Sequence, residues 1–241
     1  VVVTLLACAA YAPYIALQLQ SIALSFGAFA GQEGMAPRQL ALWTAAGLAV
    51  FTILFGTRNL DANEQHHGVV TAIAVEAVVK LVALLAVGTF VVWGVAEGPS
   101  DIMARIAAAE RPEWQIQPGR GMGLVLLAGV AIVTLPRMFQ VLVVENSDER
   151  HLAVASWAFP LYLFGMSLFV LPIAVVGLAV LPPGSNPDMF VLTLPLALGQ
   201  DGLAMLAFLG GFSAATSMVI IAAIALATMV SNHIVVPLWL A

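Results

Sequence analysis

Long apolar runs limit this chain to a small set of folds. Six stretches reach about 18 residues or more with few charges, which is the length an α-helix needs to cross a bilayer and is too long for a barrel strand. Charged residues make up only 9% of the 241 residues and hydrophobic residues 62%, whereas a soluble domain carries roughly 25% charged residues. The chain is therefore predicted to be an all-α integral membrane protein whose main partner is the lipid bilayer.

Polar and turn-forming segments separate the six predicted spans. The spans cover residues 1–29, 39–56, 68–95, 121–144, 152–181 and about 203–236. The longest loop contains the helix-forming sequence DIMARIAAAERPEW, with Asp101 as its predicted N-cap, which indicates a short helix at the membrane surface. In the fifth span, Pro160 and Pro172 are predicted to interrupt the helix, and Trp157 and Tyr162 to mark a membrane interface.

The fourth span contains Pro136 followed directly by Arg137. Proline lacks an N–H, so the helix must bend or break there, and in lipid the freed backbone groups need protein or a water-filled cavity around them. A guanidinium at this depth must face a cavity, pair, or reach an interface. Pro136, Arg137 and the neighbouring Thr134 are therefore candidate substrate-binding residues, with a simple helix kink as the structural alternative. Gln18 is a further candidate, since a membrane glutamine bonds either a ligand or a neighbouring helix.

The third span contains two ionisable residues. Glu76 and Lys80 lie four residues apart, which places them on one face of a helix. Ionisable groups within a span face the bundle interior or water. Two interpretations stay open: a self-neutralising structural pair, or a coupling or proton-handling group.

The last span carries a face of small residues at i, i+3 and i+7, formed by Gly210, Ser213 and Ser217. Hydroxyl and carbonyl oxygens are hard ligands that suit Na⁺, whereas such faces often serve only for helix packing. No other metal site is predicted. His66 and His67 are adjacent in a polar linker, without accompanying residues at metal-site spacing.

Charge and composition exclude other classes of function. The net charge is −5 and there is no basic tract, which argues against nucleic acid as a partner. The spans hold no His-rich or Ser/His/Asp constellation, so an enzyme is not predicted and no cofactor is expected beyond a coupling ion. Cys8 lies in an apolar run and is predicted to be a packing residue.

Three segments resemble the sodium/solute symporter family. Residues 135–163 are similar to the region around the family's broken helix, and their sequence is LPRMFQVLVVENSDERHLAVASWAFPLYL. Residues 56–85, with the sequence GTRNLDANEQHHGVVTAIAVEAVVKLVALL, are similar to a pair of helices in the same family. Residues 14–26, with the sequence YIALQLQSIALSF, are similar to the helix before that pair. The resemblance covers most of the chain and is closest to the transporter-type membrane domain of bacterial sensor histidine kinases.

The resemblance implies the inverted-repeat fold of the leucine transporter type, with two five-helix repeats around a midplane site. The six spans would match core helices three to eight. Residues 1–241 would then be one transmembrane domain truncated at both ends, with the missing helices, and a kinase domain, elsewhere in the parent chain. The resemblance also implies a multi-pass protein of the bacterial inner membrane that transports a small solute, such as the amino acid histidine, by cation-coupled alternating access.

Individual residues take roles through this resemblance. Pro136 matches the family proline, Gly210 the carbonyl ligand of the sodium site, and Ser213 the first of its two hydroxyl residues. The second hydroxyl position falls on Ala214, which leaves Na⁺ and H⁺ both open as the coupling ion, with Glu76 as the residue for a proton. The alternative function is a non-transporting sensory module that binds a solute and biases a histidine kinase.

Overall fold

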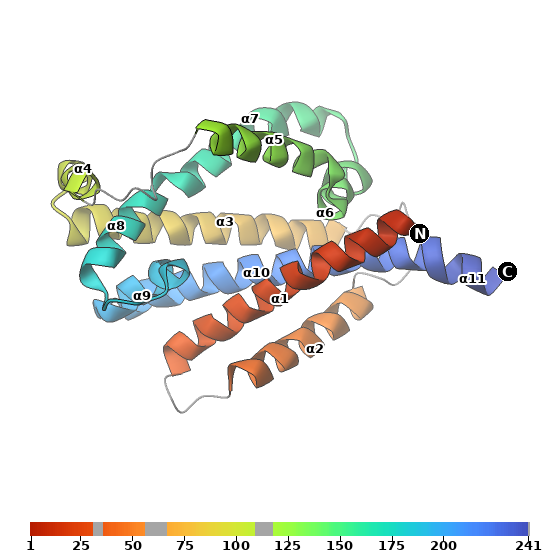
Figure 1. Ribbon diagram of the computed structural model, residues 1–241, viewed down its shortest axis with the longest axis horizontal. Coiled ribbons are helices and arrows are strands. Elements are labelled where there is room, and N and C mark those ends of the chain that lie inside the picture. The colour runs from red at the N-terminus through yellow and green to blue at the C-terminus, as the bar shows by residue number, and fades with distance from the viewer. Residues whose placement is uncertain (31–35, 56–66, 109–117, 241) are drawn as a thin grey trace. The chain divides into compact units, whose positions relative to one another are not determined.

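Every regular element in the described part of the chain is a helix. The computed structural model describes residues 1–30, 36–55, 67–108 and 118–240 (Figure 1). Within these residues, five helical runs are long and apolar enough to cross a membrane, and a bent pair of helices provides a sixth. The predicted all-helical class is therefore confirmed, and the long apolar helices are compatible with a multi-pass membrane protein.

The helical runs follow the predicted spans to within a few residues. The continuous runs are α1 (Val2–Ala30), α2 (Pro37–Phe55), α3 (His67–Phe90) with the π-helical η2 (Val91–Val95), α7 (Arg150–Leu168) with α8 (Val170–Val180), and α10 (Asp201–Val230) with the π-helical η6 (Ser231–Val235) and α11 (Val236–Leu240). The bent pair consists of α5 (Pro118–Thr134) and α6 (Pro136–Phe139), which continues into the π-helical η4 (Gln140–Val144).

Two compact units divide the chain. The first contains Val1–Val75, Pro118–Asp148 and Ala214–Ala241, and the second contains Glu76–Gln117 and Glu149–Ser213. The long helices α3 and α10 each contribute a segment to both units. The single domain predicted for residues 1–241 stays a prediction.

The first unit contains the predicted broken helix. The axes of α5 and of the segment after it differ by 55°, and Figure 1 shows α6 turned away from the line of α5. Leu135, at the break, has extended backbone with φ −74° and ψ 124°, which is the conformation that a following proline favours. In the same unit α1 runs beside α2 (Figure 1) and stays helical through Pro13. The predicted break at Pro136 is therefore confirmed.

The second unit has a core of apolar residues from α8 and α9 (Phe190–Ala197), which follows the short 3₁₀-helix η5 (Pro187–Met189). Phe190 is 2% exposed, and Val176 and Leu194 are fully buried. No helix was predicted for α9, because its eight residues are too few to span a membrane and its apolar residues do not recur at helical spacing.

The fifth predicted span has one interruption rather than two. Pro160 lies inside α7, which stays continuous around it, so the predicted interruption there is wrong. The loss of a single hydrogen bond on the exposed side of the helix is tolerated. The break falls at Phe169, with φ −104° and ψ 0°. Pro172, three residues later, supplies no N–H for the carbonyl of Leu168, where α7 ends.

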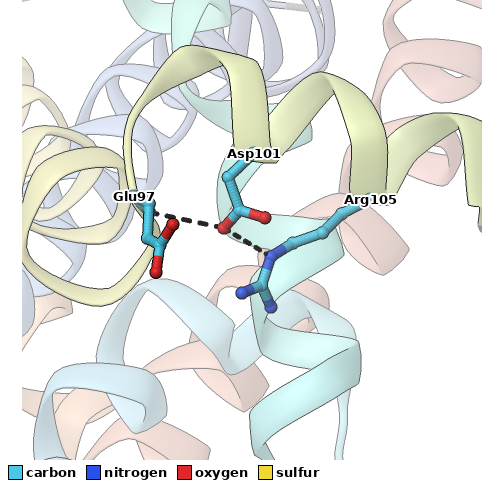
Figure 2. A network of polar contacts seen from close by, with 3 residues as sticks. All are labelled: Glu97, Asp101 and Arg105. Carbon is cyan, nitrogen blue, oxygen red and sulfur yellow. Dashed lines mark hydrogen bonds and ion pairs between the residues drawn. The ribbon is translucent and has the colours of Figure 1, made fainter.

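The predicted loop helix is present as α4 (Pro99–Ala108), but its N-cap was assigned wrongly. The helix begins at Pro99, because proline is favoured at the first helical position, and this places Asp101 within the first turn. The carboxylate of Asp101 accepts hydrogen bonds from the backbone N–H of Glu97 at 3.3 Å and from Nε of Arg105 at 2.9 Å (Figure 2). A partly exposed i, i+4 pair of this kind contributes roughly 0.3–0.5 kcal/mol.

Gly88 provides a test of the close contact between α3 and the residue where α7 meets α8. A Cβ on Gly88 would lie 2.0 Å from Cγ and 2.2 Å from Cβ of Phe169, and Phe169 is only 9% exposed. Gly88→Ala is therefore expected to lower the free energy of unfolding by about 1–3 kcal/mol through overpacking. Thermal unfolding in detergent would measure this effect.

Gly123→Ala in α5 is the matched control, since no atom lies within 4 Å of a Cβ added there. This substitution is expected to be neutral or to stabilise by up to about 1 kcal/mol through helix propensity. Equal unfolding temperatures for the two variants would contradict the close packing of Phe169 on α3.

Candidate functional site at the broken helix

The break at Pro136 removes the helical partners of several backbone carbonyls. Pro136 has no N–H to donate to the carbonyl of Ile132. The N–H of Arg137 donates to the hydroxyl of Tyr11 at 3.4 Å, rather than to the carbonyl of Val133 as it would in a continuous helix. A side chain of α1 therefore stabilises the break, and two carbonyls at the end of α5 lose their helical donors.

The helix restarts at Leu135. Its carbonyl accepts hydrogen bonds from the N–H groups of Met138 at 2.9 Å and Phe139 at 3.1 Å. Because Met138 donates to Leu135, the carbonyl of Thr134 loses its helical donor as well. The hydroxyl of Thr134 is already engaged, since it donates to the carbonyl of Val130 at 2.9 Å.

A cavity of about 350 Å³ lies against this break, within the first unit. Its apolar and polar walls come from α1, the broken span, α10 and η6. The lining residues are Val3, Val133, Thr134, Pro136, Phe139, Gln140, Val144, Ala225, Thr228, Met229, Asn232 and His233. Two π-helical segments, η4 and η6, contribute to this wall, and π-helical turns occur frequently at functional sites. Predicted site residues Thr134 and Pro136 are thus brought together in one cavity.

Several polar groups of this cavity are held by neighbouring residues. The amide nitrogen of Gln140 donates to the carboxylate of Glu145 at 3.1 Å, and the hydroxyl of Thr228 donates to the carbonyl of Ile224 at 3.0 Å. The amide of Asn232 and the imidazole of His233 complete the polar part of the wall. The cavity therefore offers hydrogen-bond donors and acceptors beside an apolar surface.

Arg137 lies on a different cavity from its neighbour Pro136. Its guanidinium carbon is 4.7 Å from the centre of the Tyr14 ring, and Nη1 donates to the Tyr14 hydroxyl and to Sδ of Met218, the latter at 3.2 Å. Arg137 and Tyr14, with Ala10, Tyr11 and Leu135, line a second cavity of about 120 Å³. Gln18 lies one turn beyond Tyr14 on α1 and is half-buried, and it lines neither of these two cavities.

The predicted ionisable residues of α3 lie in the second unit. Nζ of Lys80 is 5.8 Å from the centre of the Tyr162 ring, and the Tyr162 hydroxyl donates to the carbonyl of Ala77 at 3.2 Å. Tyr162 therefore joins α7 to α3 beside Lys80, and its predicted position at a membrane interface stays a prediction. Glu76 is half-buried, and its coupling role stays a prediction as well.

Gly210, on the small-residue face of α10, has a packing role in the second unit. A Cβ on Gly210 would lie 2.8 Å from Cβ of Ala83 and 3.3 Å from Cα of Lys80, so glycine permits the close approach of α3. The helix continues through this region, and the carbonyl of Gly210 therefore belongs to its hydrogen-bond ladder. The role of Gly210 and Ser213 as cation ligands stays a prediction.

Ser217, the third residue of this face, lies one turn beyond Ser213. It is 7% exposed, and its hydroxyl donates to the carbonyl of Ala214 at 3.2 Å. Its predicted cation role is likewise untested by this geometry. Of the linker histidines, His66 lies outside the described residues, and no group of three or more His, Cys, Asp or Glu side chains that could hold a metal ion occurs within the described ranges.

Sequence reasoning missed the partners of Arg137. Tyr11 and Tyr14 are three residues apart on α1 and flank Pro13, so they fall on one helical face. Two tyrosine hydroxyls on one face of an apolar span were a usable signal, because buried hydroxyls need hydrogen-bond partners. Asn232 and His233 lie near the end of the last predicted span, about 203–236, and were missed because they carry no motif.

Comparison with known proteins gives no match among family models, curated proteins or solved structures.

Proposed function

We propose that this chain is a solute-transport domain of the sodium/solute symporter type, with the helix arrangement of the leucine transporter class, in a bacterial inner membrane. In this proposal a small solute, such as the amino acid histidine, crosses by cation-coupled alternating access. The observation that carries the proposal is the cavity of about 350 Å³ at the broken span. In membrane proteins, broken helices at such cavities are the usual way to build a solute site.

The size and lining of this cavity suit a small amphipathic solute. Its volume lies at the lower end of the roughly 300–1,000 Å³ typical of ligand sites. Val133 and Thr134, which have carbonyls without helical donors, line it together with the side chains of Asn232 and His233. Carbonyl oxygens can accept hydrogen bonds from an ammonium group, and the apolar wall can cover a hydrocarbon portion. An amino acid carries both features.

Conformational change requires an element with two arrangements. The break between α5 and α6, bent by 55°, provides a flexible point within a span. The π-helical segments η4 and η6 lie on the same cavity. In this proposal, rotation about Leu135 opens the cavity alternately to the two sides of the membrane.

Uptake by the full-length protein in proteoliposomes tests the proposal. Radiolabelled histidine and a panel of other amino acids would be supplied under separate Na⁺ and pH gradients. Saturable uptake that requires one of these gradients is the expected result. Saturable binding of the same solute without uptake under either gradient would overturn transport and favour the sensory module.

Substitution of Asn232 tests whether the solute occupies this cavity. Asn232→Leu removes the amide and fills part of the cavity, and it is expected to weaken solute binding roughly tenfold through a lost hydrogen bond. Asn146→Leu is the control, because Asn146 does not line the cavity. The ratio of the two dissociation constants, measured by equilibrium binding, decides the result, and a ratio near one would place the solute elsewhere.

A further inference from the structure

The polar residues that line the smaller cavity are Arg137, Tyr11 and Tyr14. The guanidinium of Arg137 carries five N–H donors and a permanent positive charge. This side chain donates to the Tyr14 hydroxyl and to the sulfur of Met218. Nε is buried and has no hydrogen-bond partner among the described residues. Thus the contacts of Arg137 within the described ranges include no acidic side chain.

The two tyrosines add further donors to this cavity. The hydroxyls of Tyr11 and Tyr14 accept hydrogen bonds from the backbone N–H and the guanidinium of Arg137, respectively. Each hydroxyl has one proton and can donate while it accepts. Each therefore keeps its own proton for another acceptor. Tyr11 is only 4% exposed, so its hydroxyl proton has little access to bulk water.

A positive charge at this position calls for an anion. A guanidinium within a membrane-spanning segment is expensive unless it is paired or hydrated, and leaving a buried charge uncompensated is strongly destabilising. The cavity of about 120 Å³ is large enough for a carboxylate group and too small for most whole solutes. Planar guanidinium matches planar carboxylate through two parallel hydrogen bonds.

We propose that the cavity lined by Arg137, Tyr11 and Tyr14 is a carboxylate-binding subsite. The guanidinium supplies the charge, and the tyrosine hydroxyls donate to the carboxylate oxygens. This inference rests on the proposed function in one respect only, that the carboxylate belongs to the transported solute. It then assigns the solute to the carboxylic acids, with amino acids among them. Pro136 and Arg137 are consecutive, so the subsite adjoins the residues that line the larger cavity.

Acetate is the probe that tests this subsite, since it is the smallest stable carboxylate with a methyl group. The full-length protein, purified in neutral detergent and a chloride-free sulfonate buffer, would be titrated with acetate while its unfolding temperature is followed. A ligand that binds only the folded protein raises this temperature in a saturable way. Acetate is expected to do so, whereas acetamide, a neutral molecule of the same shape, is not. An equal effect of the two would overturn the proposal.

Two further anions separate the subsite from general anion binding. Chloride is expected to bind at least about tenfold more weakly than acetate, because it cannot form two parallel hydrogen bonds with a guanidinium. Phosphatidylglycerol added to the same detergent is expected not to compete with acetate. Equal binding of chloride, or displacement of acetate by the lipid, would overturn the assignment to a carboxylate.

Variants locate the acetate on Arg137 and Tyr14. Arg137→Gln is expected to weaken acetate binding at least about 30-fold, as for the loss of one partner of a buried charge pair. Tyr14→Phe retains the ring and is expected to weaken acetate binding about tenfold. Arg105→Gln and Tyr162→Phe are matched controls outside the first unit and are expected to bind acetate as the wild type does.

Each outcome with these variants decides the proposal. Should Arg137→Gln fail to fold, Tyr14→Phe carries the test alone. Wild-type acetate affinity in a folded Arg137→Gln variant, or the same affinity in Tyr14→Phe and Tyr162→Phe, would overturn the subsite. Binding is measured here without a gradient, so it can succeed in a protein that transports nothing. Conversely, robust uptake of a neutral solute without acetate binding would overturn the subsite and leave transport intact.

Discussion

Pro136→Ala is expected to abolish solute uptake while the protein is still made and inserted. Alanine would return the N–H that the carbonyl of Ile132 lacks, and it would remove the ring that clashes with a continuous helix. A proline inside a helix costs about 3 kcal/mol, which corresponds to a shift of about 100-fold toward the straight helix when it is removed. In the straight helix, the carbonyls of Val133 and Thr134 would again be engaged by helical N–H groups.

Initial uptake rates in proteoliposomes, normalised to the amount of reconstituted protein, would measure this effect. Pro160→Ala is the matched control, because α7 is already continuous through Pro160. Uptake by the Pro160 variant is expected to stay within about twofold of the wild type. If the Pro136 variant transported equally well, Pro136 would be reduced to a structural kink, and the solute site would have to lie elsewhere.

The sequence predicted the spans and the break because both depend on local chemistry. A run of apolar residues can satisfy its backbone in lipid only as a helix, and a missing N–H at Pro136 acts on the preceding turn. The effect of a proline nevertheless varies with its surroundings. Pro160 leaves α7 continuous, whereas the break before Pro172 falls at Phe169. The sequence alone did not distinguish these two cases.

Local sequence patterns could not predict the contacts of the candidate site. Arg137 meets Tyr11 and Tyr14 across 126 and 123 residues of sequence, and such pairing depends on how α1 packs against the broken span. Thr134, Pro136 and Arg137 were predicted together, yet Arg137 lines a different cavity from its two neighbours. Consecutive residues after a helix break point in different directions, and the 55° bend was not predictable from a proline alone.

The second prediction with a large expected effect concerns the ion that is coupled to uptake. A sodium site on α10 would draw on Ser213 and on carbonyls of the helix, but the continuous α10 engages the carbonyl of Gly210 in its own ladder. Ala214 offers no side-chain oxygen at the next position. A missing hydrogen-bonding or ligating group in a buried site costs about 1–3 kcal/mol. Sodium binding is therefore expected to be weak on this face.

Glu76 is the carboxyl group of α3 that could carry a proton at membrane depth. Nζ of Lys80 lies 5.8 Å from the centre of the Tyr162 ring, so the ammonium is directed toward α7. Uptake by the full-length protein is expected to follow a pH gradient more closely than a Na⁺ gradient. One pH unit stores about 1.4 kcal/mol per proton, so a gradient of two units can support about 100-fold accumulation at one proton per solute.

Glu76→Gln is expected to remove this accumulation, because glutamine keeps the shape of the side chain but cannot exchange a proton. The accumulation ratio would fall from as much as about 100 toward one, while downhill solute exchange between equal concentrations is expected to continue. Glu97→Gln, an exposed glutamate in the loop before α4, is the control and should accumulate solute normally. The measurement is the steady-state internal to external solute ratio under each imposed gradient. Strict Na⁺ dependence that is unchanged in Glu76→Gln would contradict proton coupling, and would show that the face around Ser213 binds the ion despite Ala214.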